Sequence, residues 1–400
     1  EMATEKVLSN DNLLEEILLR LDLPTCLVRA SLACSRWLCA VSRPAFLRRF
    51  RRLHAPRLLG FYVVGDGVPR QDFVPVPSPP ELAAVLRRAS SGLDAYSDFS
   101  FTIDDCRNGR LLVDGYRVGG TQVVSPLLHR QHHLAPALVL PPPPPASLDG
   151  VSHGYTFLPE DGGDGASYHR VDLEHHGRQV SAQVSTLGSG AWTVQIAKAE
   201  LPEPPDRIPD LTVLLRGKLY MVTTAGYILG LDLAAASFFV VQLPDGVTYQ
   251  YFGSLVLSRG YDDHHHDGDH LYLFHVVDRF QLQVWRRRPW TTAADDEAQW
   301  VLVHSICLRK ACGHLVQQTL VGFSVVGVGD NAEFAFLEED SGAFVLLWLG
   351  SRTVEKVYQR DPDNDELIIV YPVTMVWPPV FPPHQASRAK FRNLEEAEQS

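Results

Sequence analysis

Apolar residues between positions 8 and 50 recur at the spacing of one helix face, and they predict a group of short helices. The first helix carries five such positions, Leu13, Leu14, Ile17, Leu18 and Leu21. Further short helices are expected around Leu27, Trp37 and Phe46, because Pro24 ends the first helix and Pro44 breaks the pattern again before Phe46. So small a bundle buries little surface by itself. Its surplus of apolar residues therefore indicates a partner helix or an adjoining domain.

The hydrophobic pattern changes to short β-rich runs after an intermediate segment. Residues 57–64 predict a first strand, and residues 81–89 predict one helix. From Phe99 onward, apolar runs alternate with Gly, Asp, Asn and Pro turns. Turn-plus-strand units begin near 108, 216, 268 and 331, one or two periods apart if the period is roughly 45–55 residues, as in propeller blades. The repeat favours a β-propeller, with a two-sheet β-sandwich as the alternative.

Two inserts and a tail lie outside this repeat. Residues 138–145 contain a run of five prolines, which is typical of a stiff surface loop, with a polyproline helix that binds a recognition module as the alternative. Residues 261–268 form a polar loop rich in His and Asp. Residues 384–400 lack a core pattern, and they are expected to be a disordered tail or a frayed helix.

The segment from Leu8 to Phe46 resembles the F-box. The family's motif is matched at eighteen positions, Leu8, Asp11, Leu13, Leu14, Glu16, Ile17, Leu18, Arg20, Leu21, Pro24, Val28, Arg29, Ser31, Cys34, Arg36, Trp37, Pro44 and Phe46. The resemblance implies that this segment docks on a Skp-type adaptor of a cullin ubiquitin ligase. The implied adaptor-binding residues are Leu8, Leu14, Leu18, Pro24, Leu27, Val28 and Trp37. The family usually has proline where this chain has Ser9, which implies weaker adaptor binding.

The later runs are similar to the C-terminal β-propeller-like domain of plant, grass-type F-box proteins. They are residues 108–113 with 123–129, residues 216–244, and residues 282–308. This resemblance implies a domain that binds a partner protein and does no chemistry of its own. The expected fold class is α+β and multidomain. The expected domains are an all-α F-box at 1–55, a linker with one strand and one helix at 56–95, a β-propeller-like domain at 96–383 and a tail at 384–400.

Composition and charge narrow the choice of partners. The chain has 400 residues and a net charge of −11, so nucleic acid is not expected as the main partner. Residues 1–60 carry ten Lys or Arg against six Asp or Glu, which leaves a basic helix face that is expected to be solvated. The six cysteines form no Cys-x-x-Cys pair, and no secretory signal, membrane-spanning run or lipidation motif is recognised. The expected location is the cytoplasm or the nucleus.

Candidate chemistry is limited to histidine-rich loops. A cluster in the polar loop offers zinc or nickel ligands, His264, His265, His266, Asp267, Asp269 and His270. Adjacent histidines on a Gly/Asp loop are not held in a fixed geometry, so we expect no metal there, nor at the pairs 132–133 and 175–176. No nucleophile elbow or phosphate-binding loop is recognised. We expect no catalytic residue and no cofactor.

The expected function is therefore substrate recognition in a Skp–cullin–F-box ubiquitin ligase. The F-box would hold the adaptor and, through it, the cullin, while the β domain would bind a target protein. Two alternatives stay open at this stage. One is an F-box protein that acts outside a ligase, and the other is a metal-dependent hydrolase in the β domain. The sequence does not identify the target.

Overall fold

The computed structural model describes residues 10–54, 57–65, 73–91, 93, 101–115, 120–127, 137–148, 153–159, 167–208, 212–260, 270–287, 300–313, 315, 322–361, 368–379 and 381. The chain forms two compact units. The smaller unit joins Glu1–Leu59, Pro79–Ala83 and Thr374–Ser400, and the larger unit comprises Gly60–Ser78 and Ala84–Val373.

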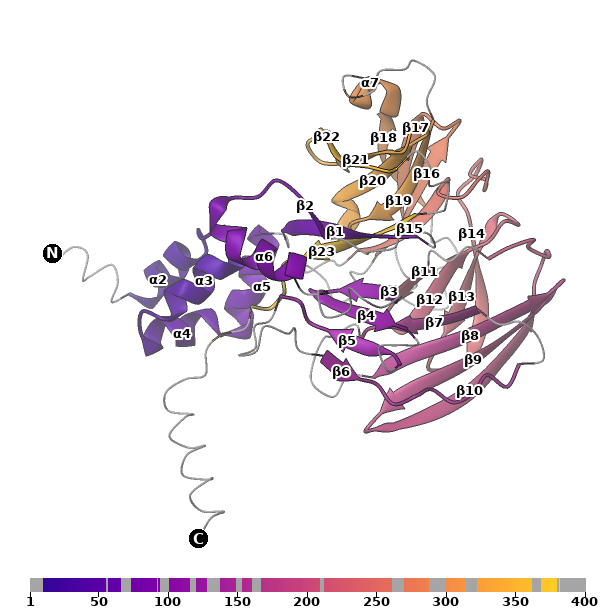
Figure 1. The fold of residues 1–400 in the computed structure, drawn as a ribbon, viewed down its shortest axis with the longest axis horizontal. Helices are drawn as coiled ribbons and strands as arrows, with labels where there is room; N and C mark the ends of the chain where they lie inside the picture. The colour runs from indigo at the N-terminus through magenta and orange to yellow at the C-terminus, as the bar shows by residue number, and fades with distance from the viewer. Residues whose placement is uncertain are drawn as a thin grey trace, which may run out of the picture. The chain divides into compact units, whose positions relative to one another are not determined.

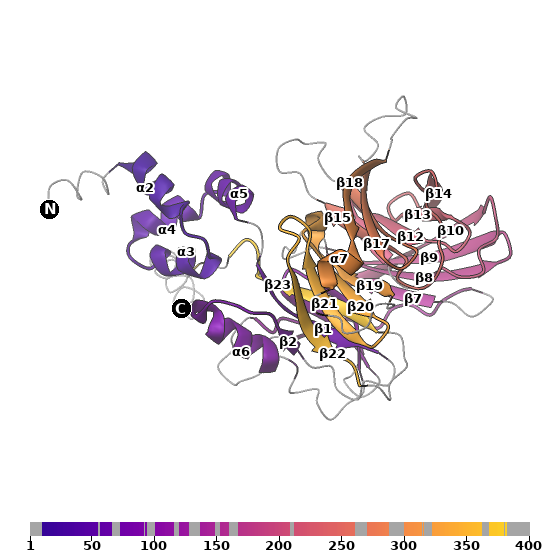
Figure 2. The same ribbon diagram turned by 90° about the horizontal axis from the view of Figure 1, so that it is seen from above.

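Short helices build the smaller unit, as the apolar spacing predicts. They are α2 (Asp11–Leu18), α3 (Pro24–Ser31), α4 (Ser35–Val41) and α5 (Pro44–Leu53), seen from two sides in Figures 1 and 2. Asn10 caps α2, since its side chain accepts a hydrogen bond from the backbone N–H of Asn12 at 3.0 Å. Proline opens both α3 and α5, a position where its missing N–H costs no helical hydrogen bond.

The core of the helical unit includes residues from the far end of the chain. Its buried members are Leu14, Leu18, Leu19, Leu27, Ala40, Val41, Phe46 and Phe50. Trp377 and Phe381 pack against this cluster. The rings of Phe50 and Trp377 stack at 5.6 Å and are nearly parallel, at 6°. Apolar cover for the bundle thus comes from the C-terminal segment of the same unit, where the sequence indicated a partner helix or an adjoining domain.

The larger unit is a six-bladed β-propeller, which confirms the propeller and excludes the β-sandwich. Five of the sheets described contain four antiparallel strands each, in sequence order. The first blade contains β3 (Thr102–Arg107), β4 (Arg110–Asp114), β5 (Gln122–Val124) and β6 (Ala137–Val139). The second blade contains β7 (His153–Phe157), β8 (Tyr168–His176), β9 (Gln179–Gly188) and β10 (Ala191–Glu200). The third is β11 (Thr212–Leu215), β12 (Lys218–Val222), β13 (Tyr227–Asp232), β14 (Ser237–Gln242). The fourth blade contains β15 (Leu255–Gly260), β16 (His270–Val277), β17 (Gln281–Arg287) and β18 (Val301–Cys307). The fifth blade contains β19 (Phe323–Val328), β20 (Phe334–Glu339), β21 (Ala343–Trp348) and β22 (Val354–Gln359).

The sixth blade joins strands from both ends of the chain. Its order is β2 (Phe73–Pro75), β1 (Leu58–Val64) and β23 (Ile369–Thr374) (Figure 1). Pairing strands from the two ends of the chain within one blade closes the ring of six blades. The strand expected within the 56–95 linker is therefore part of a blade.

Helical turns accompany the strands at three places. A short 3₁₀ helix, η1 (Pro80–Leu82), leads into α6 (Ala83–Ser91), near the helix expected at 81–89. The Tyr62 hydroxyl of β1 donates to the carbonyl of Ala89 at 2.9 Å, so the later turns of α6 are tied to the sixth blade. A second short helix, α7 (Leu308–Cys312), follows β18, and a 3₁₀ turn, η3 (Asp330–Ala332), follows β19.

Tight hairpins connect several strands at the turns that the sequence predicts. The loop Asn108-Gly109 joins β3 to β4, and Arg216-Gly217 joins β11 to β12. All four residues have positive φ, between 49° and 70°. This is the type I′ geometry whose twist matches that of paired strands, and glycine adopts it without steric cost.

Apolar clusters between neighbouring sheets form the propeller core. Between the second and third blades, Val171 and Val184 share one cluster with Leu219 and Leu229, and all four are at most 1% exposed. A similar cluster joins the fourth and fifth blades. A sheet of a few strands cannot bury both faces alone, so radial packing of the blades supplies the second face.

The proline-rich insert lies along the second blade and does not project from the molecule. The Trp192 indole N–H donates to the carbonyl of Pro141 at 3.2 Å. The Gln183 side chain donates to the carbonyl of Pro145 at 3.2 Å and accepts from the backbone N–H of Ser147 at 2.9 Å. These bonds support the stiff surface loop over an insert free to form a polyproline ligand. The expected tail at 384–400 and the whole polar loop at 261–268 lie outside the described residues.

Candidate interaction sites

The residues implied to bind the adaptor divide into buried and partly exposed groups. Leu14, Leu18 and Leu27 are at most 1% exposed, so they hold the helices of this unit together. Pro24 is buried as well. Val28 and Trp37 are half-buried and present part of their side chains to solvent. Leu8 lies outside the described residues. Direct adaptor contact stays a prediction, and in this structure only Val28 and Trp37 of the described members offer side-chain surface for it.

Leu13 and Leu32 of the helical unit, like Leu53 at the end of α5, are more exposed than any described residue of that predicted set. Leu13 on α2 is 44% exposed, and Leu32, directly after α3, is 65% exposed. Exposed apolar side chains of this size are candidates for partner contact. The helical period assigned Leu13 to the buried face, which is why sequence reasoning did not single it out.

Ion pairs attach α2 to α4 and α5. Asp11 pairs with Arg36 at 2.6 Å, Glu15 pairs with Arg43 at 2.7 Å, and Glu16 pairs with Arg49. All three pairs are substantially exposed, so each contributes about 0–1 kcal/mol to stability. They engage three of the ten basic residues between positions 1 and 60, and their exposure agrees with a solvated helix face.

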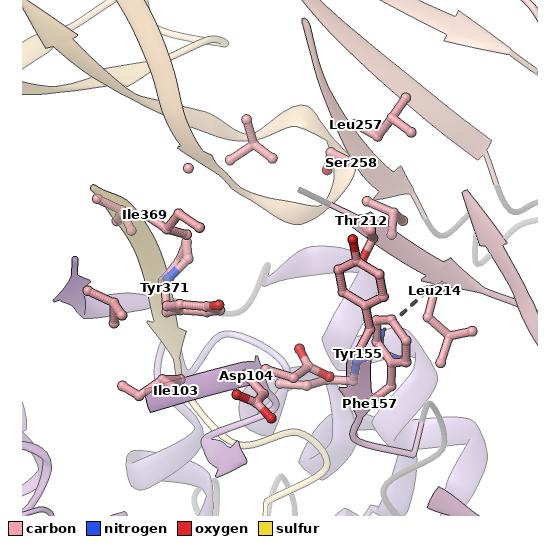
Figure 3. A pocket seen from close by; sticks show the side chains of 18 of the residues that line it. Ile103, Asp104, Tyr155, Phe157, Thr212, Leu214, Leu257, Ser258, Ile369 and Tyr371 are labelled. Atoms are coloured by element: carbon pink, nitrogen blue, oxygen red, sulfur yellow. Dashed lines mark hydrogen bonds between the residues drawn. The ribbon is translucent and has the colours of Figure 1, made fainter. Parts of the chain in front are cut away.

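The propeller contains a cavity of about 450 Å³ between its innermost strands. Residues from β3, β7, β11, β15, β19 and β23 line it, so all six blades contribute (Figure 3). Its lining is mixed, with apolar residues such as Ile103, Leu214 and Ile369, the tyrosines Tyr155 and Tyr371, and charged side chains. We call this cavity the channel site.

Asp104 is the most perturbed carboxyl group of the channel site. Burial, followed by the nearby carboxylate of Asp114, raises the pKa of Asp104 to about 6. The hydroxyl of Thr102 donates to the Asp104 carboxylate at 3.1 Å and, like the more distant Arg170, opposes this rise in pKa. A carboxyl group with this pKa in a cavity is a candidate functional group. Sequence reasoning did not find Asp104, since Asp104-Asp105 resembles any polar strand position.

Replacing Asp104 with asparagine is expected to stabilise the propeller at pH 7.5. Folding raises the pKa of this acid, so its negative charge is a destabilising contribution that is fully present above pH 6 and disappears as the pH falls toward 4. After allowance for partial solvent screening, the gain is about 1–2 kcal/mol. Calorimetric melting at pH 7.5 and 4.5 should show a higher Tm for Asp104→Asn at pH 7.5 and a smaller difference at pH 4.5. Glu355→Gln, on the exposed outer strand β22, removes the same charge and should give no such difference.

Nucleophilic groups beside the channel site are not activated. Burial raises the pKa of the Cys106 thiol, which donates to the carbonyl of Pro372 at 3.2 Å. The Ser258 hydroxyl donates to the carbonyl of Gly329 at 2.7 Å, which leaves no base to take its proton. The arrangement is suited to binding, and the described residues do not assemble a nucleophile with a base.

The histidine-rich segments do not form a metal site within the described part of the chain. No group of three or more His, Cys, Asp or Glu residues there is placed to hold a metal ion. His175 and His176 end β8, and His270 begins β16. The other histidines of these clusters, at 132–133 and 264–266, lie outside the described residues. In the same part of the chain, no helix combines the length and apolar character needed to cross a membrane.

Comparison with known proteins identifies the larger unit. A family model described as F-box protein AT5G49610-like, beta-propeller, matches residues 102–381. No curated protein matches the sequence. Among solved structures, YCF48 bound to D1 peptide is 12% identical, with 72% of this chain and 81% of that chain covered at a TM-score of 0.33.

Two further solved structures show the same level of similarity. The Cps50 (Swd1) β-propeller domain of Myceliophteria thermophila is 9% identical, with 65% of this chain and 83% of that chain covered at a TM-score of 0.33. Sqt1 of Saccharomyces cerevisiae is 12% identical, with 67% of this chain and 66% of that chain covered at a TM-score of 0.34. With TM-scores this low, these likenesses support no inference about this chain.

Proposed function

This chain belongs to the F-box protein AT5G49610-like β-propeller family, and we propose that it is the substrate-recognition subunit of a Skp–cullin–F-box ubiquitin ligase. A propeller of this family fits a general role in recognising a substrate, and such domains are typically non-catalytic interaction domains. In the proposal, the helical unit binds the Skp-type adaptor and the propeller holds the target protein. Holding the target near the transfer machinery raises the effective concentration of its lysines.

The observation that carries this proposal is the pairing of a family propeller with a four-helix unit whose sequence matches the F-box motif. In that unit, Leu14, Leu18 and Leu27 form the core. The partly exposed Val28 and Trp37 are then the proposed contacts to the adaptor. We place the protein in the cytoplasm or the nucleus, and we assign it to the plant, grass-type F-box proteins, both as parts of this proposal.

The first experiment is co-purification with a Skp-type adaptor. The full chain is compared with a chain that starts at Pro56 and therefore lacks α2 to α5. Adaptor retained by the full chain alone supports the proposal. If neither chain retains adaptor, the result favours a protein that acts outside a ligase. Exchanging Ser9 for the proline that the family usually has at this position then tests whether Ser9 is what prevents adaptor binding.

Replacing Val28 with aspartate is expected to weaken adaptor binding at least tenfold. A charge placed in an apolar contact is desolvated without a partner, which is the kind of loss that defines a binding hot spot. Affinity is measured by titrating purified adaptor against the full chain. The matched control is Leu53→Asp, which introduces the same charge at a 60% exposed leucine at the end of α5.

Both variants must melt at the wild-type temperature for this comparison to hold. If Val28→Asp binds adaptor as tightly as Leu53→Asp does, Val28 is not part of the contact surface. Trp37 would then be the next residue to exchange, because it is the other partly exposed member of the implied set.

A further inference from the structure

The carboxylate of Asp104 points into the channel site because the pairing of β3 with β4 is interrupted at this residue. Along β3 and β4, Ile103 pairs with Val113 and Asp105 pairs with Leu112, so Asp104 is the extra residue of a β-bulge. Bulges redirect side chains and occur next to binding sites. Figure 3 shows Asp104 facing the same hollow as Tyr155 and Tyr371.

Three arginines at or beside the channel site make contacts with other groups, and one of them, Arg107 on β3, lines the cavity and donates to the carbonyl of Leu214 at 3.4 Å. Arg170 pairs with Asp172 at 3.0 Å, and Arg259 pairs with Asp330 at 2.8 Å. In the described part of the chain, no Lys or Arg forms an ion pair with Asp104. The carboxylate instead faces other acids, since both Asp114 and Asp105 oppose its ionisation. Arg170 favours the ionised form only weakly, because its effect on the pKa of Asp104 is smaller than the effects of burial and of Asp114. A partly buried negative charge among other acids costs free energy, and a bound cation would recover that cost.

The walls beside Asp104 suit a cation carried on an apolar stem. Tyr155 and Tyr371 offer aromatic rings, which attract cations placed over their faces. Ile369 offers aliphatic surface to a hydrocarbon stem. The cavity, at about 450 Å³, falls in the size range of small-ligand sites and exceeds what one water molecule would occupy.

We propose that the channel site binds a primary ammonium or guanidinium group on an apolar stem, with Asp104 as its counter-ion. This is the chemistry of a lysine or arginine side chain. In assigning that side chain to a target protein, the proposal rests on the proposed function. The propeller would then recognise a target protein in part by accepting one basic side chain of that target between the six inner strands.

The test is isothermal titration of the full chain at pH 7.5 with three probes. N-acetyl-lysine N-methylamide carries the ammonium group, and N-acetyl-norleucine N-methylamide has the same stem without it. The lysine probe is expected to bind at least tenfold more tightly than the norleucine probe. Asp104→Asn should remove this preference, whereas Glu355→Gln, an equal change of charge on the exposed outer strand β22, should keep it. Equal affinity of wild type and Asp104→Asn for the lysine probe would overturn the proposal.

The third probe, 1-aminopentane, separates a protein side chain from a free small amine. The assignment to a target protein holds if the capped lysine binds at least as tightly as 1-aminopentane. It is overturned if the capped lysine binds more weakly, because its main-chain groups then obstruct entry. Adaptor co-purification is measured on the same variants. Asp104→Asn should retain adaptor like the wild type, so failure of the channel site and failure of the ligase role are seen separately.

Discussion

Replacing Trp377 with alanine is expected to destabilise the helical unit by about 2–3 kcal/mol while leaving the propeller nearly unchanged. Trp377 stacks on Phe50, which is fully buried, and the Arg51 guanidinium lies 5.7 Å from the Trp377 ring centre. Removing a fully buried aromatic side chain costs about 3–5 kcal/mol, and Trp377 is only half-buried. Hydrogen exchange of the α2 to α5 amides measures the loss directly, because it reports the stability of this unit alone.

The control for this prediction is Trp377→Phe. It keeps an aromatic ring over Phe50, and it should recover most of the lost protection in α5. Trp192→Ala, at an indole on the second propeller blade, should leave the helical amides unaffected. Wild-type exchange of the α5 amides in Trp377→Ala would show that the C-terminal segment does not support the bundle.

This dependence on Trp377 explains what the sequence could and could not predict about the helical unit. Leucine spacing is a local signal, and it located α2 correctly from Leu14 and Leu18. The bundle has more apolar residues than it can bury, which also indicated that another segment packs against it. The source of that cover could not be predicted, since Trp377 and Phe381 carry no local pattern that links them to Phe50.

The propeller was predictable where its turns are local. The pairs Asn108-Gly109 and Arg216-Gly217 occupy tight hairpins, and they mark the first and third blades. The second blade was not recognised, although β8 to β10 are 9, 10 and 10 residues long. Its strands bury polar residues such as Gln183, which is 0% exposed and bonds to the proline-rich insert. Polar residues satisfied by a distant segment look like solvent-facing ones in the sequence.

Asp104 was beyond sequence reasoning for a related physical reason. Its placement depends on the pairing of β3 with β4, where one residue is inserted without a partner. Its raised pKa depends on burial among six blades. Neither property follows from residue types near position 104. A group that destabilises the fold and yet occupies a cavity is the pattern expected of a binding residue, because function is often maintained at a cost in stability.

Replacing Gly60 with alanine is expected to destabilise the propeller by about 2–4 kcal/mol, through the blade that closes the ring. Gly60 lies on β1, where it pairs with Pro75 of β2. A Cβ atom at Gly60 would lie 2.3 Å from the backbone carbonyl oxygen of Val74 and 2.5 Å from the ring of Phe73. A backbone atom cannot rotate away, so β2 would have to move, and the contact between the Phe73 and Tyr62 rings would be lost with it.

Calorimetric melting separates this effect from a general cost of removing glycine. The matched control is Gly350→Ala, since a Cβ atom there meets nothing within 4 Å. Gly60→Ala should lower the Tm of the propeller transition by several degrees, and Gly350→Ala should leave it within about a degree. A wild-type Tm for Gly60→Ala would mean that β2 yields without cost. The ring would then be held closed by the pairing of β1 with β23 alone, and the N-terminal strand β2 would have no part in its stability.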